Sequence, residues 1–151
     1  MNLLIVKGSL FAALLITAAV WDMRKRQIPD GIPLVILPVG IIGLSFTGLL
    51  SSLIGAILTA LPYFLASVLV KKKDRLAVGG GDVKLMAGCR FILGVWGGIL
   101  QSILALSLAV LAGMVVAALK RKKVNQIQIP LAPFICAGGI FAYYAVIAAK
   151  F

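Results

Sequence analysis

Long apolar runs alternate with short polar stretches along this chain. Spanning a membrane as a helix takes roughly 20 predominantly apolar residues. The runs that approach this length are residues 3–21, 32–50, 53–70, 83–95, 96–119 and 129–149. Apolar and polar residues do not alternate with the period of two that a membrane β-barrel shows. We therefore expect an all-α, polytopic membrane protein with about six transmembrane helices, of which the fourth is short.

The overall composition supports this expectation. Hydrophobic residues make up 62% of the 151 residues, and the mean hydropathy is +1.14. A soluble domain of this size cannot cover so much apolar material with polar surface. No linker, low-complexity tract or repeat divides the sequence, so residues 1–151 are expected to form a single membrane-embedded domain.

Basic residues gather between the apolar runs. The formal net charge is +11, and most lysines and arginines fall in residues 24–26, 71–75 and 120–123. Under the positive-inside rule these loops are cytoplasmic, which places both termini on the non-cytoplasmic side. Such clusters suit anionic lipid headgroups. Nucleic acid is not an expected partner, because no basic aromatic surface outside the bilayer is available for it.

Acidic residues are rare, so each one needs an explanation. The chain has no glutamate and no histidine, and its acids are Asp22, Asp30, Asp74 and Asp82. Without histidine, Ser-His-Asp, Cys-His and His-ligated zinc sites are excluded. Cys89 and Cys136 are isolated and form no CxxC pair, so we expect neither a metal nor another cofactor.

Two of the acids are placed to work together. Asp22 lies at the cytoplasmic end of the first predicted span, and Asp82 lies at the cytoplasmic start of the fourth. Two neighbouring carboxylates do not both ionise easily, so one keeps a proton while the other acts as a base on a shared water. The three residues before Asp82 are glycines, which let the backbone bend and an extended substrate approach.

Each of these residues also has a structural interpretation. Asp82 is a suitable cap for the helix that it begins, and Asp22 is close enough to a neighbouring arginine for an interfacial ion pair. We interpret Asp30 as the N-cap of the second span and Asp74 as a solvated loop residue. Lys84 either assists the carboxylate pair or the substrate, or adds to the cytoplasmic positive charge.

Three motifs connect the chain to a known family. Gly79-Gly80-Gly81-Asp82-Val83-Lys84 resembles the GxGDxK motif of the type IV prepilin peptidases, which are membrane-embedded aspartyl proteases. Asp22, followed by a basic stretch and Ile28-Pro29, is similar to the other catalytic segment of that family. Residues 129–134 resemble its proline-phenylalanine opening of the last helix. The resemblance covers essentially the whole chain and the order of its spans.

The resemblance implies an endopeptidase that removes the short basic leader of type IV pilin-like precursors at the cytoplasmic face of the cell membrane. Asp22 and Asp82 carry over as the catalytic dyad. The residues that carry over as motif or substrate-approach positions are Gly79, Gly80, Gly81, Lys84, Ile28, Pro29, Pro130 and Pro133.

Two departures from the family pattern are visible. The larger members have an N-terminal region with paired CxxC motifs and also N-methylate the mature pilin. This sequence carries no such region, so it resembles the short peptidase-only branch. Asp30 stands where asparagine is more common after Ile-Pro.

Two rival functions stay open at this point. One is an enzyme that binds a phospholipid or another phosphate in the glycine-rich loop, although Asp82 would repel that anion. The other is a non-enzymatic channel or scaffold subunit, in which the acids line an ion path.

Overall fold

The computed structural model describes residues 2–43, 49–50, 52–57, 61, 65, 80–121 and 129–148. Every regular element in this part of the chain is a helix, which confirms the all-α class. The four helices are α1 (Asn2–Lys25), α2 (Gly31–Ile41), α4 (Gly80–Lys120) and α5 (Ala132–Ala148). Residues 52–57 are also helical.

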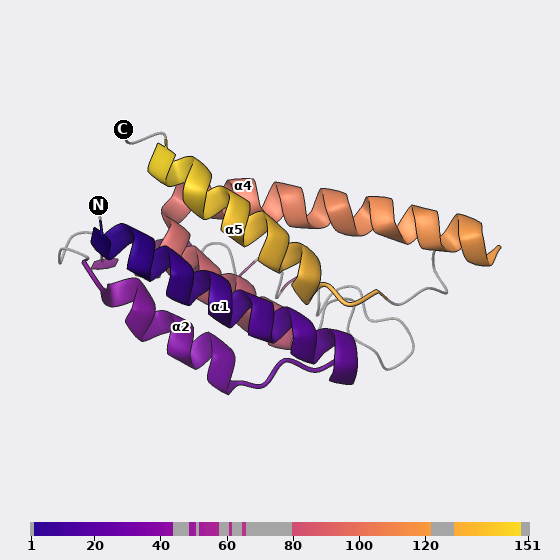
Figure 1. Cartoon of the computed structure of the whole chain (residues 1–151), viewed down its shortest axis with the longest axis horizontal. Coiled ribbons are helices and arrows are strands. Elements are labelled where there is room, and N and C mark those ends of the chain that lie inside the picture. The colour runs from indigo at the N-terminus through magenta and orange to yellow at the C-terminus, as the bar shows by residue number, and fades with distance from the viewer. Residues whose placement is uncertain are drawn as a thin grey trace.

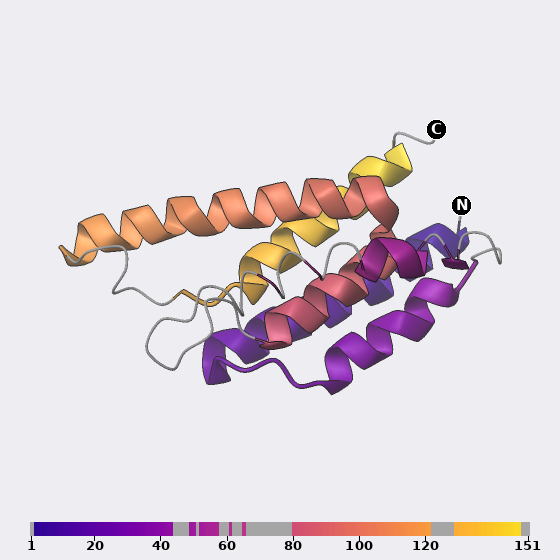
Figure 2. The ribbon, with the colours of Figure 1, turned by 180° about the vertical axis from the view of Figure 1, so that it is seen from behind.

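The helices run side by side in a bundle (Figures 1 and 2). α5 packs against both α1 and α4, and α2 packs against α4 and α1. The later half of α4 extends beyond the other helices. The first turn of α1 and the last turn of α5 lie at the same end of the bundle, away from the end of α1 and the start of α4.

Two helical stretches, Leu3–Lys25 and Gly80–Lys120, are long and apolar enough to cross a membrane, and α2 and α5 are shorter apolar helices. The third predicted span, residues 53–70, falls mostly outside the described residues. The count of about six spans and the orientation of the termini therefore stay predictions.

A kink in α4 separates the predicted fourth and fifth spans. Gly94 has φ +67° and ψ −168°, which no helical residue adopts. A Cβ atom added at Gly94 would meet nothing within 4 Å. The backbone conformation, not crowding, therefore requires glycine at this position.

The second span ends earlier than the apolar run predicts. α2 ends at Ile41, and Gly43 turns the chain with φ +74°. The buried Lys7 of α1 donates hydrogen bonds from Nζ to the carbonyl oxygens of Gly40 (2.8 Å) and Ile42 (3.0 Å). These bonds satisfy carbonyl groups that a helix leaves open at its C-terminus.

Small residues allow α5 to approach its neighbours closely. A Cβ at Gly138 would lie 2.9 Å from the Gln101 carbonyl oxygen of α4, and one at Gly139 would lie 2.8 Å from Leu15 Cδ1 of α1. Such contacts are typical of membrane helix interfaces. The bundle core also contains the fully buried side chains of Phe11, Leu15, Ile36, Leu85, Cys89 and Ile135.

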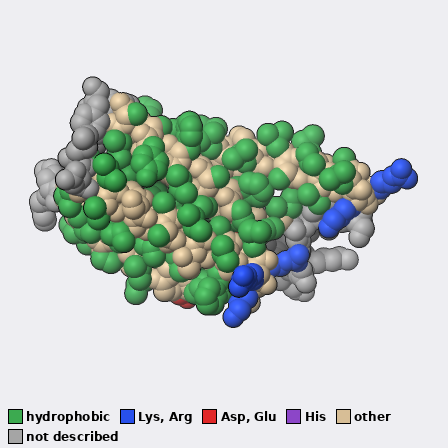
Figure 3. Space-filling model, in the orientation of Figure 1, with side chains coloured by type: hydrophobic (Ala, Val, Ile, Leu, Met, Phe, Trp, Pro, Cys, Tyr) green, Lys and Arg blue, Asp and Glu red, His purple; other side chains and the backbone are tan. Residues whose placement is uncertain are grey.

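The face shown in Figure 3 carries apolar side chains along its whole length, and its lysine and arginine side chains lie toward one end. Trp96 is 82% exposed and Leu119 is 79% exposed. Lysine and arginine side chains gather where α1 and α4 end. An apolar belt with a basic margin suits a bilayer and its anionic headgroups.

Candidate active site

Asp22 and Asp82 line the same cavity, which has a volume of about 460 Å³. The cavity lies between the end of α1, the segment that leads to α2, and the first turn of α4. We call it the aspartate cavity. The residues that line it are Asp22, Arg26, Gln27, Ile28, Pro29, Asp30, Gly80, Gly81 and Asp82.

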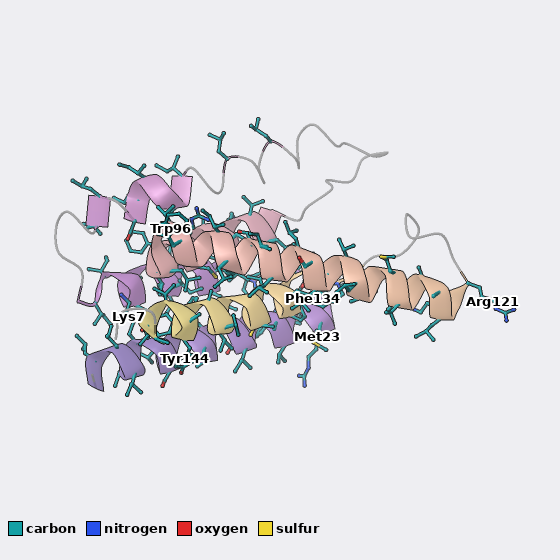
Figure 4. The ribbon with its side chains drawn as sticks, turned by 90° about the horizontal axis from the view of Figure 1, so that it is seen from above. Lys7, Met23, Trp96, Arg121, Phe134 and Tyr144 are labelled. Atoms are coloured by element: carbon teal, nitrogen blue, oxygen red, sulfur yellow. The ribbon has the colours of Figure 1, made fainter. Side chains whose placement is uncertain are left out.

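Asp22 is held by the first residue of α5. Its side chain is only 6% exposed, and Oδ2 accepts a hydrogen bond of 3.2 Å from the backbone N–H of Ala132. In Figure 4, the labels Met23 and Phe134 show that the end of α1 lies near the start of α5. Because the first N–H groups of a helix have no partner within it, this carboxylate also serves as a cap for α5.

The chain turns sharply after Asp22 to form the next wall of the cavity. The Arg26 N–H donates to the Asp22 carbonyl oxygen at 2.8 Å, and Arg26 itself adopts φ 51°. Positive φ ends a helix effectively. Residues 27–29 then run without regular structure to α2, and this brings Ile28 and Pro29 to the cavity.

Asp82 reaches the cavity because α4 begins close to that segment. It lies in the first turn of α4 and is half-buried. A Cβ added at Gly81 would lie 3.0 Å from Ile28 Cβ, whereas one at Gly80 would meet nothing within 4 Å. Gly81 therefore permits close packing on Ile28, and Gly80 leaves open space beside Asp82.

The structure corrects our interpretation of Asp30. Asp30 occupies the N-cap position of α2, but its side chain makes no capping hydrogen bond. Its backbone is in the right-handed helical region (φ −59°, ψ −21°), unlike the extended backbone usual at a side-chain cap. Asp30 Oδ1 instead lies 2.7 Å from Lys84 Nζ, in an ion pair with 76% and 57% exposed side chains.

The other predicted site residues have four different outcomes. Ile28, Pro29, Gly80 and Gly81 line the aspartate cavity. Pro130 and Pro133 do not line it but flank the start of α5, whose Ala132 holds Asp22. Lys84 meets the cavity only through Asp30, and Gly79 lies outside the described residues.

Sequence reasoning missed Ala132. Its side chain carries no chemistry, and its contribution is a backbone N–H. The available signal was its position between Pro130 and Pro133, since proline near a helix start marks where free N–H groups occur.

A second, apolar groove of about 390 Å³ lies next to the Asp30–Lys84 ion pair. It is bordered by α2, by residues 53–57 and by α4, and its lining includes Leu34, Leu37, Leu53 and Phe91 together with Asp30 and Lys84. The polar aspartate cavity and this apolar groove therefore share Asp30.

Comparison with known proteins assigns the chain to a family. The profile of the type IV leader peptidase family matches residues 9–118, a range that includes both Asp22 and Asp82. The chain belongs to the type IV leader peptidase family.

A curated relative supports this membership. The prepilin leader peptidase/N-methyltransferase of Bacillus subtilis (strain 168) is 33% identical over 136 residues, which cover 88% of this chain and 53% of the relative. The chain thus spans about half the length of the relative that it matches. No solved structure matches it significantly.

Proposed function

We propose that this leader peptidase family member is an aspartyl endopeptidase whose catalytic pair is Asp22 and Asp82. The observation that carries the proposal is that two carboxylates far apart in sequence line one cavity, next to the glycine-rich start of α4. Cleavage by two carboxylates needs no nucleophilic side chain, and it suits a chain without histidine.

The proposed reaction uses one water molecule. One aspartate, ionised, removes a proton from the water as its oxygen attacks the scissile carbonyl carbon. The other aspartate, protonated, donates its proton to the carbonyl oxygen, and the tetrahedral intermediate then breaks at the C–N bond. The proton taken from water goes to the leaving amine, and the proton on the former carbonyl oxygen returns to the second aspartate as the carbonyl re-forms. The hydrogen bond from Ala132 fixes the orientation of the Asp22 carboxylate for this exchange.

The proposed substrate is a type IV pilin-like precursor, cleaved after its short basic leader at the cytoplasmic face of the cell membrane. The aspartate cavity contains three of the four acids in the chain, against one arginine. Lys84 offsets the charge of Asp30, but the carboxylates of Asp22 and Asp82 still disfavour an anionic phosphate at this site. The exposed basic residues near the same end of the bundle agree with a cytoplasmic location.

Co-expression with a pilin-like precursor tests the proposal. We expect the unmodified chain to remove the leader, and the variants Asp22→Asn and Asp82→Asn to remove none while still inserting into the membrane. Both an acid and a base are needed on the water, so either change is sufficient. Asp74→Asn is the matched control and should retain activity. Substantial cleavage by either dyad variant would exclude that aspartate from the mechanism.

A further inference from the structure

We propose that the Asp30–Lys84 ion pair is a positioning device that holds the start of α4 in register with the segment following Asp22. This inference rests on the proposed function, because the register matters through the distance between the two catalytic carboxylates. Asp30 and Lys84 are thus positioning residues, and neither is assigned a role on the water.

The ion pair joins the two walls of the aspartate cavity. Asp30 ends the segment that leads away from Asp22, and Lys84 lies in α4 just after Asp82. The 2.7 Å contact between Lys84 Nζ and Asp30 Oδ1 therefore connects α4, which carries Asp82, to the end of the segment that follows Asp22.

The ion pair lies between two close apolar contacts on the same face of α4. A Cβ at Gly81 would lie 3.0 Å from Ile28 Cβ, and one at Gly88 would lie 3.3 Å from Ile36 Cγ2. Positions 81, 84 and 88 follow the three- and four-residue spacing that puts side chains on one helix face. Contacts through glycine let the helices approach but do not resist sliding along the helix axis. The ion pair between Asp30 and Lys84 opposes such sliding, because a shift of either cavity wall lengthens the contact.

The expected effect is modest, because both side chains are largely exposed. Exposed ion pairs stabilise one arrangement over another by about twofold to fivefold. Small displacements of reacting groups lower catalytic rates. Loss of the pair should therefore lower the rate of cleavage without abolishing it.

Charge exchange tests the proposal with purified full-length protein and a pilin-like precursor. We expect Lys84→Met and Asp30→Ala each to lower kcat about twofold to fivefold with KM little changed. The double variant Asp30→Lys with Lys84→Asp should recover at least half of the lost rate. Asp30→Asn removes the charge but keeps an acceptor oxygen for Lys84, so its kcat should fall between those of Asp30→Ala and the unmodified protein. An exchanged pair no better than the single variants, or an effect confined to KM, would overturn the proposal.

Ionic strength provides a readout that a merely structural role would not give. At about 1 M salt the Debye length is about 3 Å, so an exposed ion pair is weakened. The ratio of the unmodified rate to the Lys84→Met rate should fall toward one as salt rises. A ratio that does not change with salt would contradict the proposal.

A distance measurement separates this proposal from the proposed function. Spin labels at Met23→Cys, which is 65% exposed in the native chain, and at Gly80→Cys, which has open space around it, would report the separation of α1 and α4. The background carries Cys89→Ala and Cys136→Ala. We expect a broader distance distribution with Lys84→Met and recovery in the exchanged pair. Unchanged distributions would refute the positioning role even in an active enzyme, whereas failure of the unmodified chain to cleave would refute only the proposed function.

Discussion

At the scale of single residues, the contact between Asp22 and Ala132 gives one side chain two separable roles. The carboxylate is a proposed catalytic group, and it also accepts the hydrogen bond from the first N–H of α5. A buried N–H that loses its acceptor costs about 1–3 kcal/mol. Two substitutions at Asp22 can therefore distinguish its catalytic role from its contribution to stability. One removes only the charge, and the other removes the charge and the hydrogen-bond acceptor.

We expect Asp22→Asn and Asp22→Ala to be equally inactive but unequal in stability. The asparagine side chain still offers an oxygen to Ala132, so its melting temperature in detergent should stay close to that of the unmodified protein. The alanine variant should lose about 1–3 kcal/mol of stability. Equal melting temperatures for the two variants would show that the hydrogen bond contributes nothing.

Gly80 and Gly81, the two described glycines before Asp82, make a matched pair of substitutions. Gly81→Ala places a Cβ against Ile28 and should push α4 away from the other cavity wall, which lowers cleavage several-fold. Gly80→Ala meets open space and should keep most of the activity. The test compares the initial cleavage rates of the two variants on the same precursor. Equal loss at both positions would mean that backbone freedom, rather than packing at Ile28, sets the requirement.

At the scale of elements, the break in α4 depends on one residue. Any side chain at Gly94 must adopt a positive φ, which costs roughly 1–2 kcal/mol. We expect Gly94→Ala to lower the stability of the purified protein by about that amount. Gly113→Ala is the control, since its Cβ would only approach Ile129 Cδ1 at 3.4 Å. A Gly94→Ala protein as stable as the control would mean that α4 tolerates a straight path.

The sequence predicted these elements unevenly, for physical reasons. Apolar runs predicted α1, α4 and α5, because the hydrophobicity of a segment can be read from that segment alone. The early end of α2 was not predicted, since it depends on Gly43 and on Lys7, which is distant in sequence.

The site shows the same difference between local and distant signals. Asp22 and Asp82 were expected together because each ends or begins a span, and both line the cavity. The pairing of Asp30 with Lys84 was missed, because cap propensity is a local property and the lysine comes from another helix. Ala132 was missed because a backbone donor has no sequence signature of its own.

At the scale of the whole molecule, the two ends of the bundle should face opposite sides of the membrane. Trp96 lies at the end that also holds Lys7 and Tyr144, and Arg121 lies at the far end of α4 (Figure 4). In a background with Cys89→Ala and Cys136→Ala, we expect Trp96→Cys to react with an impermeant thiol reagent in intact cells. Arg121→Cys should react only after lysis. The reverse pattern would place the aspartate cavity outside the cell.

The position of the two chain ends also has a practical consequence. The first turn of α1 and the last turn of α5 lie together, separated from Asp22 by most of the length of α1, which at 24 residues is about 36 Å. An affinity tag or a fluorescent fusion partner joined at either end would therefore leave the cavity mouth open to a precursor. If both ends lie on the predicted non-cytoplasmic side, reporters fused to them should give the same signal for compartment.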